Sequence, residues 1–212
     1  MSAPATATRP TRLYLLRHGE VESRYHKVFG GSKIDMELSD LGHKQVKAAA
    51  DYLQRHPPAV MYASPMKRVQ QTLAPLSQWT NLKPIILPGL REVDFGAWTG
   101  LSWDQVYQRF QVSAFDWLNQ LELGSIAEAE STADFRRRVD DALRQILSHS
   151  PNKEIAVVAH GGTIRMILAL ILDLPFTKMA AFDIEYASIT KIKITQHKTE
   201  VELLNFTPWR DL

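Results

Sequence analysis

The stretch LYLLRHG, residues 13–19, decides the fold, because an apolar run leads directly into a histidine, His18, followed by glycine. A second stretch, IAVVAHGG at residues 155–162, repeats this design and contains His160. Short apolar runs without alternation are typical of strands buried on both faces of a parallel sheet. Both stretches are therefore predicted to be central strands, each delivering a histidine at its carboxyl end.

A third apolar run, VMYA at residues 60–63, leads into Ser64 and a predicted helix that carries Arg68. The carboxyl ends of parallel strands meet at one edge of the sheet, and ligands of open α/β sheets bind beyond that edge. We therefore expect Ser64 and Arg68 to gather there with His18 and His160. Two histidines, arginines and the amino ends of helices form a site suited to a dianionic phosphate.

The rest of the chain alternates between strand and helix patterns. Ser39 and Ser131 are expected to cap helices over roughly 40–55 and up to about 148. The predicted fold class is α/β, with three layers and a mostly parallel central sheet flanked by helices. The alternation of isoleucine with lysine at residues 191–194 predicts an antiparallel hairpin at the C-terminal edge of the sheet.

Composition excludes several classes of function. The 212 residues include no cysteine, so disulfides, thiolate zinc sites and cysteine-based catalysis are excluded. A net charge of +2 gives no argument for nucleic acid, and a small anionic substrate is compatible with it. No apolar run approaches the ~20 residues that span a bilayer. The sequence thus predicts a cytoplasmic protein that binds neither nucleic acid nor membrane.

Three local features lead to further expectations. Residues 1–11 are rich in Ala, Thr and Pro, which predicts a flexible tail before a single domain at 12–212. Pro75 is expected to kink or interrupt the helix that carries Arg68. The arginine run at 136–138 is expected to lie on the solvated face of its helix, because the apolar stripe of that helix faces inward.

Four motifs along the chain resemble those of the histidine phosphatase superfamily, which includes cofactor-dependent phosphoglycerate mutases. They are the RHG motif at 17–19, an SPxxR segment at 64–68, the acid-donor loop REVDFG at 91–96 and AHGG at 159–162. One such motif is weak evidence, because short patterns recur by chance. Four motifs in the family's order, spanning residues 13–165, are specific.

The resemblance implies a role for each matching residue. His18 is implied as the nucleophile that carries the phosphoryl group, and Glu92 as the acid that protonates the leaving group. The resemblance implies no metal and no organic cofactor. The residues expected to bind the phosphoryl oxygens are Arg17, Arg68, His160 and Gly161.

The chain departs from the family pattern at one place. Many family members have an asparagine seven residues after the motif arginine, and this chain has Arg24 there, preceded by Ser23 where tryptophan is common. Arg24 could bind a second anionic group of the substrate, or it could point to solvent.

The resemblance favours a phosphatase of small phosphate monoesters. The DFGAWTG segment at 94–100 and the compact segment after it resemble the small bacterial phosphatases that include α-ribazole-phosphate phosphatases. A phosphoglycerate mutase and a non-catalytic phosphate-binding module are the alternatives. A metallohydrolase that uses His18 and His160 is disfavoured, because Arg17 would repel a divalent cation. The expected partner is a small phosphorylated metabolite, and the chain is expected to be a monomer or a homodimer.

Overall fold

The computed structural model describes residues 9–212, so most of the predicted tail at 1–11 lies outside the described residues. Thr11 already begins the first strand. Within the described part of the chain, no helix is long and apolar enough to cross a membrane.

An open six-stranded sheet forms the centre of the molecule, with strand order β3-β2-β4-β1-β5-β6. Strands β1 to β4 run parallel to one another, β5 is antiparallel to β1, and β6 is antiparallel to β5. This arrangement confirms the mostly parallel α/β sheet and the antiparallel hairpin at its C-terminal edge. The strands are β1 (Thr11–Arg17), β2 (Val60–Ala63), β3 (Ile85–Ile86), β4 (Glu154–Ala159), β5 (Ile189–Ile194) and β6 (Thr199–Phe206).

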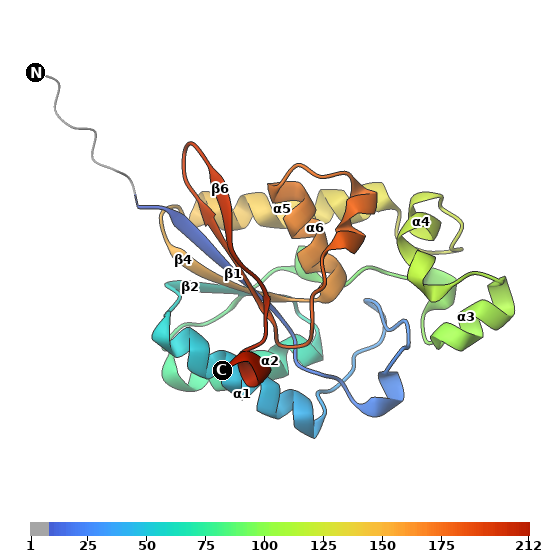
Figure 1. Cartoon of the computed structure of the whole chain (residues 1–212), viewed down its shortest axis with the longest axis horizontal. Helices are drawn as coiled ribbons and strands as arrows, with labels where there is room; N and C mark the ends of the chain where they lie inside the picture. Colours follow the sequence, from blue (N-terminus) through green and yellow to red (C-terminus); the bar gives the residue numbers. More distant parts are fainter. Residues whose placement is uncertain (1–8) are drawn as a thin grey trace, which may run out of the picture.

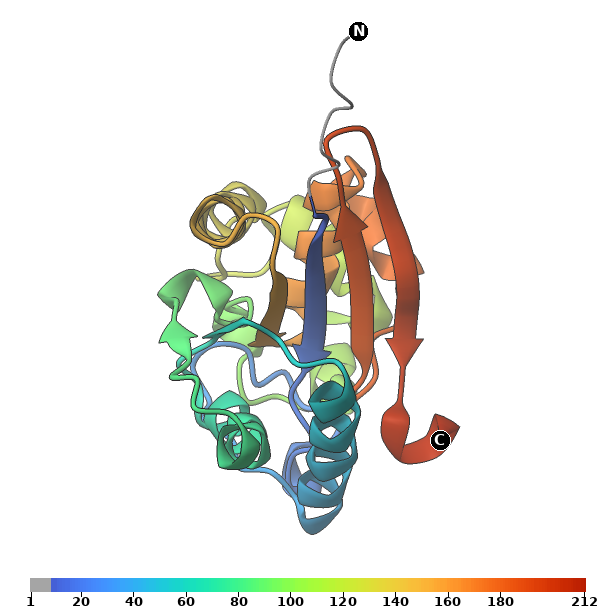
Figure 2. The ribbon, with the colours of Figure 1, turned by 90° about the vertical axis from the view of Figure 1, so that its left-hand side faces the viewer.

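Helices cover both faces of the sheet, as Figures 1 and 2 show. Helices α1 and α2 pack on one face, α5 and α6 pack on the other, and α3 and α4 lie beyond the end of the sheet (Figure 1). The helices are α1 (Asp40–Arg55), α2 (Lys67–Trp79), α3 (Trp103–Phe110), α4 (Trp117–Glu122), α5 (Thr132–His149), α6 (Gly161–Ile171) and α7 (Pro208–Asp211). Short 3-10 helices are η1 (Ser23–Tyr25), η2 (Pro88–Leu90), η3 (Gly96–Trp98), η4 (Ala114–Asp116) and η5 (Phe176–Ala181).

The central strands are buried on both faces, which explains their unbroken apolar runs. In β1, Leu13 and Leu15 point into the core under α5 and α6, and Tyr14 and Leu16 point into the core over α1 and α2. All four side chains are 2% exposed or less. Because successive side chains of a strand point to opposite faces, one strand contributes to both cores and fixes the sheet between the helical layers.

The helix caps expected from the sequence are present, and the expected interruption at Pro75 is not. The side chain of Ser39 accepts the amide of Gly42 at the start of α1, and Ser131 caps α5 in the same way. Pro75 does not interrupt α2, which runs through it from Lys67 to Trp79. A proline removes one backbone hydrogen bond, and the buried side chains on both sides of Pro75 keep this helix packed against the sheet.

Candidate active site

The register of the parallel strands places His18, Ser64 and His160 at one edge of the sheet. Arg17 pairs with Ala159, and Ala63 pairs with Val158, so the residue after each strand emerges at nearly the same level. The rings of His18 and His160 lie edge to face with their centroids 5.2 Å apart. The juxtaposition expected from the strand ends is therefore present in the structure.

Hydrogen bonds fix the tautomer of His18. Its Nδ1 lies 2.8 Å from the carbonyl oxygen of Gly19, which can only accept, so Nδ1 carries the proton. Its Nε2 accepts the Nε–H of Arg68 at 3.2 Å. Burial lowers the pKa of His18 well below its usual value, and the charges of Arg68 and Arg17 lower it further. The imidazole is thus neutral, with a lone pair on Nε2.

His160 is held in the opposite tautomer. Its Nδ1 also accepts the Nε–H of Arg68, at 3.2 Å, and its Nε2 therefore donates to Ser64 Oγ at 2.8 Å. Burial lowers the pKa of His160 well below its usual value, with further lowering by Arg68 and His18. The hydroxyl of Ser64, a residue the sequence placed here without a role, orients this ring.

Arg68 lies between the two imidazoles and is anchored at its far end. Its Nη1 and Nη2 donate to the carbonyl oxygens of Ile34 and Gly31, each at 3.1 Å. The side chain is only 3% exposed, and this burial lowers the pKa of Arg68 to about 10. The loop that follows β1 thus clamps the guanidinium against both histidines.

One N–H group of Arg17 has no hydrogen-bond acceptor among the described residues. Its Nη1 donates to the carbonyl oxygen of Ile184 at 2.6 Å, and its guanidinium stacks on the ring of Tyr186 at 3.9 Å. Its Nε is buried and meets no acceptor among the described residues. A buried, unsatisfied donor of positive charge costs free energy unless an anion binds it, so Arg17 is suited to hold a phosphoryl oxygen.

The carboxylate of Glu92 lies on the first turn of α6. It accepts the amide N–H groups of Gly162 and Thr163 at 3.0 and 3.1 Å, and that of Val93 at 3.0 Å. A Cβ atom added at Gly162 would lie 2.6 Å from Glu92 Oε1, so only glycine admits the carboxylate there. The amino end of α6 therefore holds this side chain in place.

The prediction of a solvated arginine run is wrong for Arg138. Its guanidinium donates to the carbonyl oxygens of Gly89, Arg91 and Glu92, at 2.8, 2.7 and 3.1 Å. It also pairs with Glu130 at 2.8 Å. The periodicity of α5 assigned this side chain to solvent, because the sequence could not show that the acid-donor loop crosses over it. Arg138 fixes the backbone that carries Glu92.

A small pocket of about 120 Å³ brings four of the predicted residues together. Arg17, His18, Arg68 and Glu92 line it, along with Tyr186, which the sequence analysis missed because no motif surrounds it. His160 is fully buried behind this pocket and acts on it through Arg68.

Gly161 and Arg24, the other two predicted site residues, do not line this pocket. Gly161 begins α6 beside Arg17, whose Nε would lie 3.5 Å from an added Cβ. Arg24 lies elsewhere. It pairs with Glu22 at 2.7 Å, its side chain is 67% exposed, and it does not line the pocket. Among residues 9–212, no three His, Asp or Glu side chains are grouped as metal ligands.

A family model described as "Histidine phosphatase superfamily (branch 1)" matches residues 13–207. The chain belongs to the histidine phosphatase superfamily. The resemblance inferred from four motifs is thereby confirmed, and the match extends over nearly the whole domain.

Several relatives of this superfamily member are named as phosphatases. Phosphoserine phosphatase 1 of Hydrogenobacter thermophilus is 28% identical over 200 residues, which cover 92% of each chain. A mycobacterial glucosyl-3-phosphoglycerate phosphatase has a similar structure, with a TM-score of 0.82 and 26% identity over 93% of this chain and 100% of that one. The predicted enzyme class, a phosphoric monoester hydrolase, agrees with these relatives.

The α-ribazole phosphatase of Shigella flexneri shares the fold. Its structure aligns with a TM-score of 0.81 over 92% of this chain and 96% of its own. Because the two sequences are only 24% identical, this likeness supports a shared fold alone.

Proposed function

We propose that this superfamily member is a metal-independent phosphatase that hydrolyses small phosphate monoesters through a phosphohistidine on His18. The observation that carries the proposal is the hydrogen bonding of His18. Gly19 holds the proton on Nδ1, which leaves the lone pair of Nε2 beside the guanidinium of Arg68. A neutral imidazole that lines an anion-binding pocket and has an unprotonated nitrogen can act as a nucleophile.

In the first step, Nε2 of His18 attacks phosphorus as the ester P–O bond breaks. Arg17 and Arg68 stabilise the negative charge of the equatorial oxygens, which is where charge is spread in phosphoryl transfer. Glu92, which lines the same pocket, gives its proton to the leaving oxygen, so the alcohol departs uncharged.

In the second step, a water molecule attacks the phosphohistidine and the P–N bond breaks. The carboxylate of Glu92 accepts the proton of this water, which restores the acid for the next cycle. Inorganic phosphate leaves and His18 returns to its neutral state. Throughout, His160 and Ser64 keep Arg68 in place.

The test is phosphate release from a panel of monoesters in the presence of excess chelator, with His18→Ala as the control. The panel contains a nitrophenyl ester, sugar phosphates, phosphoglycerates and α-ribazole phosphate. We expect the wild-type protein to release phosphate and His18→Ala to release none, because the mutant has no nucleophile. A 32P-labelled, acid-labile protein adduct on the wild type alone would identify the phosphohistidine.

Other outcomes point to other functions. Interconversion of phosphoglycerates without net hydrolysis would identify a mutase. Binding of phosphate esters without turnover would identify a binding module. Activity that the chelator abolishes and one metal restores would contradict the metal-independent mechanism.

A further inference from the structure

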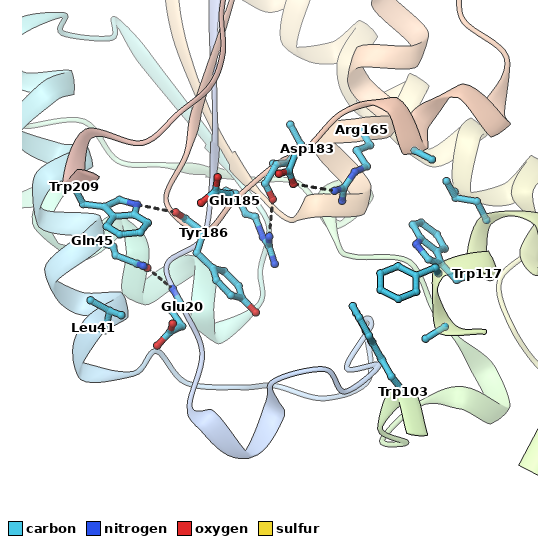
Figure 3. Close-up of a pocket in the computed structure, with 16 residues that line it drawn as sticks. Glu20, Leu41, Gln45, Trp103, Trp117, Arg165, Asp183, Glu185, Tyr186 and Trp209 are labelled. Carbon is cyan, nitrogen blue, oxygen red and sulfur yellow. Dashed lines mark hydrogen bonds and ion pairs between the residues drawn. The ribbon is translucent and has the colours of Figure 1, made fainter. Parts of the chain in front are cut away.

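The small pocket lined by His18 is called the phosphate pocket below. A second and much larger pocket opens beside it. Its volume is about 730 Å³, and Arg17 and Tyr186 line both pockets. Because the two pockets share these residues, the large pocket (Figure 3) is a space into which the leaving group of an ester bound at His18 can extend. Pockets of roughly 300–1,000 Å³ are those that enclose drug-sized ligands, so this space exceeds what a three-carbon alcohol fills.

Aromatic side chains form one wall of the large pocket. Trp103, Phe115 and Trp117 come from α3, η4 and α4, and Figure 3 shows Trp103 and Trp117 across the pocket from Tyr186. The rings of Trp103 and Phe115 meet edge to face at 4.9 Å. Phe115 is nevertheless 81% exposed. Trp103 and Trp117 are half-buried. An exposed ring beside two half-buried ones on the wall of a pocket favours a ligand that presents a planar face.

The charges of the large pocket favour a leaving group without an anionic group. The described lining residues with carboxylates are Glu20, Asp183 and Glu185, and the described cations are Arg17 and Arg165. Arg17 serves the phosphate pocket. Arg165 donates its Nε–H to the carbonyl oxygen of Phe182, with its Nη2 4.0 Å from the carboxylate of Asp183. Glu185 pairs with Arg210 at 2.9 Å, so the charges around the lining nearly balance. Beyond Arg17, the described lining leaves no cation free to pair with a carboxylate on the leaving group.

We infer that the preferred substrates are phosphate monoesters of a large, uncharged alcohol that carries a planar ring, such as a nucleoside. The phosphoryl group binds at Arg17 and Arg68, and the ring stacks on the wall formed by Trp103, Phe115 and Trp117. This inference rests on the proposed phosphatase function and adds the class of its leaving group.

The test compares esters that differ only in the inferred feature. Adenosine 5′-monophosphate and ribose 5-phosphate are both esters of the ribose 5′-hydroxyl. Only the first carries a planar base that can stack. We expect kcat/KM to be about tenfold higher for the nucleotide, in the range found for one base stacked on an aromatic side chain. 3-Phosphoglycerate should be hydrolysed no faster than glycerol 3-phosphate, because the described lining offers its carboxylate no free cation.

Phe115→Ala links the preference to the aromatic wall. The side chain is exposed, so its removal leaves the core intact. We expect this variant to lower the nucleotide-to-ribose ratio of kcat/KM severalfold, mainly through KM. Tyr107→Ala is the matched control, because Tyr107 is an exposed aromatic residue on α3 that does not line the pocket.

The outcomes separate the inference from the proposed function. Equal or better hydrolysis of ribose 5-phosphate, a preference for 3-phosphoglycerate, or an unchanged ratio in Phe115→Ala would each overturn the ring-bearing class while the phosphatase stands. Absence of hydrolysis of every ester, the nitrophenyl ester included, would overturn the phosphatase itself.

Discussion

One N–H group of Arg68 serves two imidazoles. Its Nε lies 3.2 Å from Nε2 of His18 and 3.2 Å from Nδ1 of His160, so both rings present an unprotonated nitrogen to the same cation. A nearby positive charge disfavours a second one, and burial acts in the same direction. The site therefore holds two neutral histidines around one guanidinium, and in the proposed mechanism the phosphoryl dianion of the substrate balances its positive charge.

The proposed role of Glu92 as the proton donor leads to a prediction at this scale. Glu92→Gln keeps the shape of the side chain and removes the transferable proton. We expect turnover of an alkyl phosphate to fall by about 10²–10⁴-fold, and that of a nitrophenyl ester much less, because nitrophenolate leaves without a proton. Steady-state rates for the two esters measure the difference. Equal losses for both would exclude Glu92 as the acid.

The acid-donor loop depends on a neighbouring element, helix α5. Arg138 on this helix donates to three carbonyl oxygens of the loop and is held in turn by Glu130. A loop fixed by one half-buried guanidinium is expected to move when that guanidinium is removed. The amides at the start of α6 then hold the carboxylate of Glu92 from the other side.

Replacing Arg138 should therefore misplace the proton donor. We expect Arg138→Met to lower kcat for an alkyl phosphate by about tenfold to a hundredfold, the range for a displacement of about 1 Å in an active site. A nitrophenyl ester should lose much less, because the defect acts through Glu92. Kinetics of both esters below the melting temperature test this.

The neighbouring arginine provides the control for this experiment. Arg137 is 69% exposed and pairs with Asp134 on the solvent side of α5, so Arg137→Met should leave the kinetics intact. A loss in Arg138→Met that is equal for both esters would show that Arg138 supports only the fold.

At the scale of the whole molecule, the two neutral buried histidines make the free energy of unfolding depend on pH. The pKa values of His18 and His160 in the folded protein lie well below the unfolded value of about 6.5. As the pH falls below 6.5, the unfolded chain takes up protons that the folded protein refuses, so the free energy of unfolding decreases. Each such group contributes about 1.4 kcal/mol per pH unit in that window.

We expect His18→Asn to reduce this slope. Urea denaturation between pH 5 and 7 should give a wild-type curve that falls more steeply toward pH 5 than the curve of the variant, by about 1.4 kcal/mol per pH unit. His197→Asn, at an exposed histidine of the β5–β6 turn, controls for the loss of an imidazole. Parallel curves for wild type and His18→Asn would contradict a lowered pKa for His18.

The sequence by itself determined the sheet and the gathering of the site residues on its edge. The apolar runs of β1 and β4 need both faces buried, and each run ends in a histidine followed by glycine. Parallel strands in register then bring His18 and His160 together. Local pattern was enough here, because strand direction and burial are properties of each short segment.

Only the tertiary structure decided the roles of Arg138 and Tyr186 and the shape of the large pocket. Arg138 lies in a run of arginines that a helical wheel assigns to solvent, and its partner Glu92 is 46 residues away. Tyr186 stacks on Arg17, from the other end of the chain. The pocket has walls from separate segments whose side chains meet only after folding. The physical reason is that these contacts arise between elements, and the periodicity of a segment records only which side it buries.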